Sequence, residues 1–279
     1  MKIAIIGSGA MGCLYGAYLS KKNKVIMVDV VDKVVDTICE KGITIKENDG
    51  SEHHYKENIT AYHSGKCHEK VDLIIMFVKS TYLEDALEQN KDLFHDDTIV
   101  MSLQNGAGND RKIEKYVKKE NIIIGTSKHN ARSEGCAIVC HTGHGETTIG
   151  SNYDAKDILE KVETILKDCS FDTVVSDDIQ RIIWSKLFVN LSINTFTAIT
   201  QTPIGYMIKN ENAWNFAKRL VYEAVEVAEE DGTYFDRKEA LAYVREVCVN
   251  SENGYSSMYQ DRKRKIRTEI DAINGAIVE

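Results

Sequence analysis

Three polar side chains at regular spacing lie in the mostly apolar segment at residues 182–194. Lys186, Asn190 and Asn194 follow one another at intervals of four residues, so on a helix they form one polar stripe that drifts by about 40° at each step. A lysine in a mostly apolar helix costs free energy unless it is paired or faces a cleft, and two asparagines there forgo helix propensity. The stripe therefore predicts one wall of a ligand site. The alternative is a lysine that reaches solvent beside two amides that bond neighbouring helices.

A glycine-rich loop follows the first strand expected from the sequence, at residues 2–6. The loop, Gly7-Ser8-Gly9-Ala10-Met11-Gly12, leads directly into a helix that runs through residue 19. In this context the first glycine permits a tight turn, the second lets the backbone approach a pyrophosphate, and the third lets helix and strand pack closely. The helix N-terminus then faces the phosphates. The loop predicts a dinucleotide site, and an ordinary sharp turn is the alternative.

An aspartate ends the second predicted strand, at residues 24–29. Asp29 would accept hydrogen bonds from an adenosine ribose 2'-hydroxyl and would repel a 2'-phosphate. The next residues include Lys33 but no arginine, so the local sequence favours NAD(H) over NADP(H). The alternative is an aspartate that caps the next helix.

Two further polar residues end predicted strands. Asn105 follows the strand at residues 98–102, within Gln104-Asn105-Gly106, and Lys79 follows the strand at residues 71–78. Ligands of open α/β sheets bind at the carboxyl ends of strands, so both residues are candidates for contact with cofactor or substrate. Otherwise Asn105-Gly106 is an ordinary turn and Lys79 a solvated residue.

Near the chain's end, Ser257 and Glu269 flank the basic run Arg262-Lys263-Arg264-Lys265. Twelve residues on one straight helix would set Ser257 and Glu269 about 120° apart. They converge on one site only if the helix breaks between them. Acidic neighbours make the basic run a solvated helix face rather than a nucleic-acid site.

Charge and cysteine content exclude several classes of protein. The 35 Lys and Arg against 43 Asp and Glu give a net charge of −8, so nucleic acid and acidic membranes are not expected partners. No apolar run approaches the roughly 20 residues that span a bilayer, and residues 71–78 form the longest. Seven irregularly spaced cysteines are typical of reduced thiols in a cytoplasmic protein. Cys136 and Cys140 on one strand would lie about 13 Å apart, so these thiols with His141 and His144 predict no metal site.

The elements that must position these residues fall into two classes. Short β-branched runs alternate with helical stretches up to about residue 176, which predicts a parallel sheet covered by helices. Residues 42–62, with Asn48-Asp49-Gly50, read as a hairpin or an excursion from that scheme. From residue 177 onward helical periodicity dominates, as in the apolar stripe Trp214, Ala217, Val221, Ala224 and Ala228. The predicted domains are therefore residues 1–176 and 177–279.

The glycine-rich start, Gln104-Asn105-Gly106, Trp184-Ser185-Lys186-Leu187 with Asn190 and Asn194, and the block from Ser256 to Asp271 together resemble the ketopantoate reductase family. The resemblance covers nearly the whole chain. It implies an α/β fold with a Rossmann-type dinucleotide-binding domain followed by an all-α domain, and an interdomain cleft in which NADPH reduces a 2-keto acid. It also implies a closing helix beyond residue 279.

By the family pattern, Lys186 donates the proton, Asn105 and Glu269 position it or the substrate, and Asn190, Asn194 and Ser257 bind substrate. The residues Gly7 to Gly12, Asp29, Lys79 and Asn105 would contact the cofactor, which the resemblance makes NADP(H). Of the functions that the resemblance allows, the first is ketopantoate reduction in coenzyme A precursor synthesis. Ile204, after Pro203, leaves open a related 2-keto acid reductase, and a protein that senses nicotinamide nucleotides without turnover is a third alternative. A homodimer is left open.

Overall fold

The computed structural model describes residues 1–278, and the helix expected beyond residue 279 lies outside the described residues. The chain divides into two compact units. Unit 1 contains residues Met1–Gln104 and Gly108–Ile179, and unit 2 contains Asn105–Ala107 and Gln180–Glu279. Each unit has its own apolar core.

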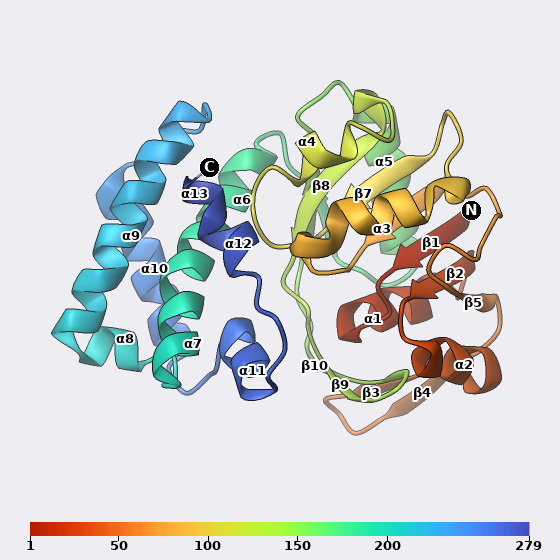
Figure 1. The fold of residues 1–279 in the computed structure, drawn as a ribbon, viewed down its shortest axis with the longest axis horizontal. Coiled ribbons are helices and arrows are strands. Elements are labelled where there is room, and N and C mark those ends of the chain that lie inside the picture. Colours follow the sequence, from red (N-terminus) through yellow and green to blue (C-terminus); the bar gives the residue numbers. More distant parts are fainter. Residues whose placement is uncertain (279) are drawn as a thin grey trace. The chain divides into compact units, whose positions relative to one another are not determined.

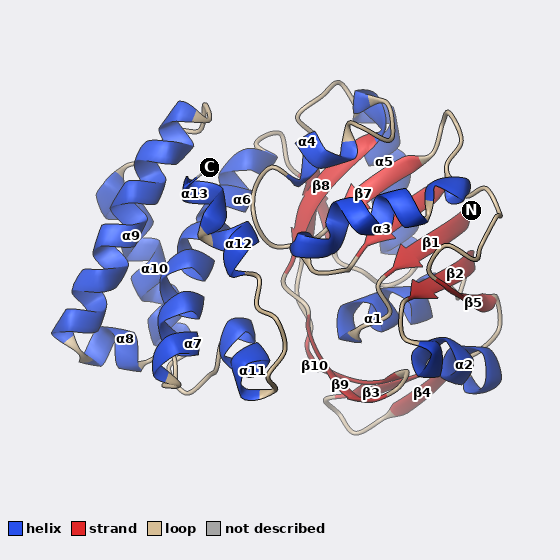
Figure 2. Ribbon diagram, viewed as in Figure 1, coloured by secondary structure: helices blue, strands red, loops and turns tan. Residues whose placement is uncertain are grey.

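An eight-stranded sheet forms the centre of unit 1 (Figures 1 and 2). Its strands, in spatial order, are β12 (Thr173–Val175), β11 (Thr147–Gly150), β8 (Ile122–Ser127), β7 (Ile99–Ser102), β6 (Leu73–Met76), β1 (Lys2–Ile6), β2 (Lys24–Asp29) and β5 (Ile59–His63). All neighbours pair in parallel except β8 and β11. The prediction of a parallel sheet is confirmed.

Five α-helices and three short 3₁₀ turns connect these strands, and α3 lies across one face of the sheet in Figure 1. The helices are α1 (Ala10–Leu19), α2 (Asp32–Lys41), α3 (Leu83–Gln89), α4 (Asn109–Ile113) and α5 (Lys156–Asp168), and the turns are Ser80–Tyr82, Lys91–Leu93 and Lys119–Asn121. Helix α1 is buried along nearly its whole length, because it contacts β1 and β2 as well as a second, smaller sheet.

That second sheet accounts for the excursion expected at residues 42–62. It has the order β4 (Glu52–Tyr55), β3 (Ile43–Glu47), β10 (Ile138–Gly143) and β9 (Asn130–Gly135). Strands β3 and β4 form an antiparallel hairpin around Gly50, whose φ is 86°. The last part of the stretch, β5, returns to the large sheet beside β2.

Within its described residues, unit 2 is helical. Its elements are α6 (Ile179–Val189), a π-helix (Asn190–Asn194), α7 (Thr195–Thr200), α8 (Tyr206–Lys209), α9 (Glu211–Glu230), α10 (Arg237–Asn250), α11 (Ser257–Lys263), α12 (Ile270–Ile273) and α13 (Gly275–Val278). The predicted apolar stripe of α9 packs into the core with Trp184 and Phe188 of α6. The all-α character of this part of the chain is confirmed.

One apolar helical run is longer than the uninterrupted apolar runs in the sequence suggested. The run Ile179–Thr200 has 22 residues, and its most apolar 18-residue window has a mean hydropathy of 1.2, so the run is long and apolar enough to cross a membrane by length and composition alone. The expectation that residues 71–78 form the longest such run is therefore wrong, because charged and amide residues divide the longer helix in the sequence. About 67% of its most apolar window is buried, as in the core helix of a globular unit.

Candidate functional site

The glycine-rich loop has the close contacts that its pattern predicts. Gly7 has a φ of 101°, and a Cβ there would lie 2.6 Å from the backbone nitrogen of Val78. A Cβ on Gly12 would lie 1.9 Å from the carbonyl oxygen of Gly7. A Cβ on Gly9, by contrast, would meet nothing within 4 Å. Gly7 and Gly12 are thus fixed by packing, whereas Gly9 keeps the backbone open to a ligand.

The N-terminus of α1 is suited to a phosphate group. Gly9 occupies the N-cap position without a capping side chain, and no acidic residue lies in the first turn, which includes Ala10 and Met11. The backbone N–H groups of that turn and the helix dipole both favour an anion. These features fit the pyrophosphate of a nicotinamide dinucleotide.

A cavity of about 390 Å³ adjoins this loop at the carboxyl ends of β1, β2 and β6. It is lined by Ile6, Gly7, Val28, Asp29, Val30, Ser64, Val78, Tyr82, Asp85, Ala86 and Gln89. Its mostly apolar walls and two carboxylates fit an adenosine half of a dinucleotide. Neither Lys33 nor Lys79 is among these lining residues, and no other lysine or arginine is.

Asp29 holds the two loops that border this cavity. Its Oδ2 accepts a hydrogen bond from the backbone N–H of Ser8 at 2.7 Å, and its Oδ1 accepts one from Val31 N–H at 3.0 Å. Val31 is the N-cap of α2 and that helix has no side-chain cap, so the alternative of a helix-capping aspartate is not what the structure shows. Each carboxylate oxygen keeps a second lone pair for a ligand.

Lys186 projects from α6 in unit 2 and is partly buried. Burial lowers the pKa of its ammonium group from 10.5 to about 8, and the negative charge of Glu269 opposes that shift. The lysine is therefore mostly protonated at neutral pH, yet its proton is far easier to release than that of a solvated lysine.

Asn105 meets Glu269 although 164 residues separate them. The Asn105 side-chain amide donates to Glu269 Oε2 at 3.2 Å. The neighbouring Gly106 has a φ of 95°, and a Cβ there would lie 2.5 Å from the carbonyl oxygen of Ala272. This close approach sets Asn105 against the start of α12, so the amide fixes the carboxylate that acts on Lys186.

The two asparagines of the stripe remain neighbours, but not on a regular α-helix. Residues Asn190–Asn194 form a π-helix, which corrects the expectation of one α-helix through residue 194. Asn194 Nδ2 donates to Asn190 Oδ1 at 3.1 Å and lies 3.5 Å from Ser257 Oγ. Asn190 is only 8% exposed, and its Nδ2 has no hydrogen-bond partner within residues 1–278. A buried amide donor of this kind is costly unless a ligand accepts from it.

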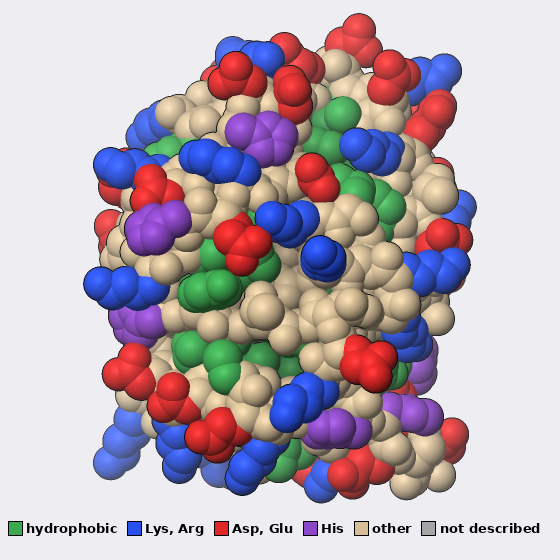
Figure 3. Space-filling view, turned by 90° about the vertical axis from the view of Figure 1, so that its right-hand side faces the viewer, with side chains coloured by type: hydrophobic (Ala, Val, Ile, Leu, Met, Phe, Trp, Pro, Cys, Tyr) green, Lys and Arg blue, Asp and Glu red, His purple; other side chains and the backbone are tan. Residues whose placement is uncertain are grey.

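The helix break required between Ser257 and Glu269 is present. Helix α11 ends at Lys263, Lys265 has a φ of 58°, and α12 begins at Ile270. The chain therefore turns back, so Ser257 reaches Asn194 while Glu269 reaches Asn105. The basic run at residues 262–265 is exposed. Figure 3 shows another face of the protein, on which basic and acidic side chains are interspersed.

Sequence reasoning missed two groups of residues. Asn274 donates to the Leu191 carbonyl at 3.1 Å and accepts from Thr195 Oγ1 at 2.6 Å, which stabilises the π-helix. Its only sequence signal is an amide among apolar residues. Tyr82, Asp85 and Gln89 line the cavity in unit 1, but their local pattern indicates only a helix.

Two family models match the chain, and both are described as ketopantoate reductase PanE/ApbA. The first covers residues 3–154, and the C-terminal model covers residues 178–279. The chain is 33% identical over 285 residues to the 2-dehydropantoate 2-reductase of Lactococcus lactis subsp. lactis, with 99% of this chain and 90% of the relative covered. The corresponding enzyme of Streptococcus pyogenes serotype M6 is 30% identical over 280 residues, with the same coverage.

A solved structure is also closely similar. The ternary structure of D-mandelate dehydrogenase with NADH and anilino(oxo)acetate superposes with a TM-score of 0.92 at 34% identity, and covers 100% of this chain and 91% of that one.

Proposed function

Because this chain belongs to the ketopantoate reductase family, we propose that it reduces 2-dehydropantoate to pantoate, a step of pantothenate and coenzyme A synthesis, with a nicotinamide cofactor. The observation that carries the proposal is a partly buried Lys186 one helical turn before Asn190, whose buried Nδ2 has no hydrogen-bond partner among the described residues. A proton donor and a neutral hydrogen-bond donor side by side suit a keto acid, which presents a carbonyl oxygen and a carboxylate.

In this proposal Lys186 is the general acid. A bound nicotinamide supplies the hydride that reduces the keto carbon. The carbonyl oxygen develops negative charge, which the Lys186 ammonium stabilises and then neutralises by giving up its proton. A pKa of about 8 suits this task, because the group is charged at neutral pH and is still a competent acid.

The other residues of unit 2 orient that reaction. Glu269 favours the charged lysine, and Asn105 holds the Glu269 carboxylate through its 3.2 Å hydrogen bond. Asn190 offers an amide N–H, Asn194 an amide oxygen and Ser257 a hydroxyl to the substrate's carboxylate and hydroxyl groups. The mutual hydrogen bond of the two asparagines sets the direction of the free Asn190 N–H.

The residues Gly7, Ser8, Gly9, Ala10, Met11 and Gly12 would hold the pyrophosphate, with Asp29 at the adenosine ribose. Family membership favours NADP(H). Asp29 and Asp85 in the cavity wall, without a lining cation, favour NAD(H) instead. Lys79 comes directly before the turn Ser80–Tyr82, and its cofactor role is part of this proposal.

A second candidate is NADH-dependent reduction of another 2-keto acid to its 2-hydroxy acid. Two observations favour it. The cavity wall contains the carboxylates of Asp29 and Asp85 and no lysine or arginine, and the chain is similar to a D-mandelate dehydrogenase solved with NADH. Ile204, buried in the core of unit 2 with Met207, is the position at which the chain departs from the ketopantoate pattern.

A steady-state screen separates these functions. Purified protein would be assayed with 2-dehydropantoate, an aryl 2-keto acid and a branched aliphatic 2-keto acid, each with NADPH and with NADH. The highest kcat/KM for 2-dehydropantoate supports the first function, and a preference for another keto acid with NADH supports the second. Nucleotide binding without turnover of any keto acid would refute both and support a sensing protein. The cytoplasmic location and a homodimer remain part of the proposal.

A further inference from the structure

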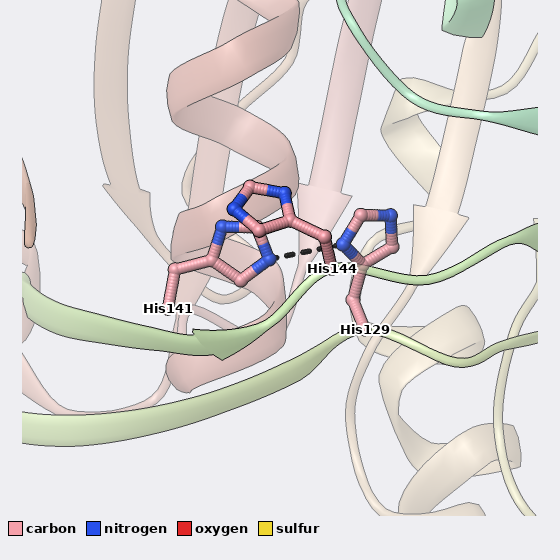
Figure 4. A group of neighbouring side chains, drawn as sticks. All are labelled: His129, His141 and His144. Atoms are coloured by element: carbon pink, nitrogen blue, oxygen red, sulfur yellow. Dashed lines mark hydrogen bonds between the residues drawn. The ribbon is translucent and has the colours of Figure 1, made fainter. Parts of the chain in front are cut away.

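Three histidines from separate segments of unit 1 converge beside β10, and none of them is assigned above to substrate or cofactor (Figure 4). His141 lies on β10, His129 lies just before β9, and His144 follows the end of β10. One ring nitrogen from each lies within 4.8 Å of the other two. His129 lies outside the pattern Cys136, Cys140, His141 and His144, from which no metal site was expected.

Glu47 of β3 determines the tautomer of His141. A carboxylate only accepts hydrogen bonds, so the 3.0 Å contact between His141 Nδ1 and Glu47 Oε2 requires Nδ1 to carry the proton. Tyr18 donates to the other Glu47 oxygen and fixes the carboxylate. The lone pair of a neutral His141 is therefore on Nε2. A carboxylate that orients a histidine in this way is the usual support of a metal-binding imidazole.

That lone pair faces a second imidazole. His141 Nε2 lies 3.0 Å from Nδ1 of His129, while Nε2 of His129 has no hydrogen-bond partner among the described residues although the side chain is only 7% exposed. Two imidazole nitrogens that face each other at this distance are suited to share a metal ion, because imidazole is the commonest metal ligand in proteins.

His144 completes the group from the solvent side. Its ring centroid is 4.0 Å from that of His141, its Nε2 is 3.2 Å from Glu47 Oε2, and its side chain is 62% exposed. An ion bound at about 2.0–2.1 Å from each nitrogen needs nitrogens roughly 3.3 Å apart. The buried pair is already near that separation, and the exposed ring has the freedom to move inward.

We propose that His129, His141 and His144 bind one divalent transition-metal ion of the zinc class, with Glu47 orienting His141. Three imidazoles select such an ion over Mg²⁺ or Ca²⁺, which prefer oxygen ligands. The ion would join β10 to the chain segments that precede β9 and follow β10. The site is independent of the proposed reduction, because none of its residues is assigned to substrate or cofactor.

Isothermal titration of chelator-treated full-length protein with Zn²⁺ tests the proposal, with Mg²⁺ as a second titrant. We expect one Zn²⁺ per chain, no comparable Mg²⁺ binding, and a rise in Tm with Zn²⁺. His144→Ala, at an exposed position that should not disturb folding, should weaken Zn²⁺ binding at least about tenfold. The matched control is His68→Ala, which removes an exposed histidine paired with Asp92 at 2.7 Å, and it should bind Zn²⁺ as the wild type does.

A buried variant gives an independent check. His129→Gln should also lose Zn²⁺ binding while it retains the folded far-UV spectrum, and if it fails to fold, His144→Ala alone decides. Absence of stoichiometric Zn²⁺ binding by the wild-type protein would overturn the proposal. So would a His144→Ala variant with unchanged affinity, since the three histidines would then form only a hydrogen-bonded network.

Discussion

The charge on Lys186 should control the pH dependence of catalysis, and Glu269 should set where the transition falls. Reduction uses the protonated lysine, whose pKa is about 8. The kcat/KM for keto-acid reduction should therefore be flat near pH 6–7 and fall about tenfold per pH unit well above 8. The reverse oxidation uses the neutral lysine, so its rate should rise through the same pH range.

Replacing Glu269 by Gln removes the charge that raises the Lys186 pKa and keeps an oxygen that can accept from Asn105. An opposite charge nearby typically shifts a pKa by one to three units. Because solvent screens charges at this partly exposed site, we expect a shift of about one unit. A midpoint near pH 7 leaves about one lysine in eleven protonated at pH 8, against one in two in the wild type. The expected loss in kcat/KM is about fivefold at pH 8 and small at pH 6.

Initial rates of reduction across pH 5.5–10, at saturating cofactor, measure both the flat and the falling part of the kcat/KM profile. The matched control is Asp271→Asn, which removes a nearby carboxylate paired with Arg267 at 3.0 Å and should leave the midpoint unchanged. In Lys186→Ala the limb near pH 8 should disappear and kcat should fall about 10²–10⁴-fold. An unchanged or raised midpoint in Glu269→Gln would refute the proposed electrostatic role, and an equal loss at every pH would instead indicate direct contact with substrate.

Three further outcomes are expected. Gly12→Ala should lower the free energy of unfolding by about 3 kcal/mol and abolish cofactor binding, because its Cβ would lie 1.9 Å from the Gly7 carbonyl oxygen; thermal denaturation and cofactor titration measure this, and a near-native Tm would contradict it. Asp29→Asn should raise the ratio of kcat/KM for NADPH to that for NADH at least about tenfold by removing a charge from the cavity, and an unchanged ratio would place cofactor selection elsewhere. Asn190→Ala should raise KM for the keto acid with little change in Tm, because its Nδ2 has no partner in the described protein; a large drop in Tm with unchanged KM would show a structural role.

The glycine-rich loop and Asp29 could be predicted from the sequence because they lie within one strand–helix–strand stretch, residues 2–29. Strands β1 and β2 and helix α1 begin and end where the pattern of apolar residues and glycines indicated. The strand predicted at residues 71–78 is shorter, at Leu73–Met76. The reason is tertiary, since the N–H groups of Phe77 and Val78 both bond the Ile6 carbonyl and bend the chain toward the glycine-rich loop.

The polar residues of unit 2 were predictable from the sequence, but their geometry was not. Helical spacing placed Lys186, Asn190 and Asn194 on one face, yet the π-helix depends on Asn274, whose bond to the Leu191 carbonyl spans 83 residues. The contact of Asn105 with Glu269 spans 164. Local periodicity contains no information about such pairs, because it reports which face of an element is apolar and not which distant residue meets it.

The same distinction explains why the histidine cluster was invisible in the sequence. Metal-site patterns are recognised when ligands lie a few residues apart in the sequence, as Cys136, Cys140, His141 and His144 do, and that pattern failed on the expected strand geometry. The group that forms instead needs His129 from before β9 and a carboxylate from β3, brought together by the parallel pairing of β3 with β10. Register places Glu47 opposite His141, so the tautomer of His141, and with it the direction of the lone pair toward His129, follows from a strand pairing that joins residues 94 positions apart. A site built in this way is specified by topology, and its test must act on the assembled protein.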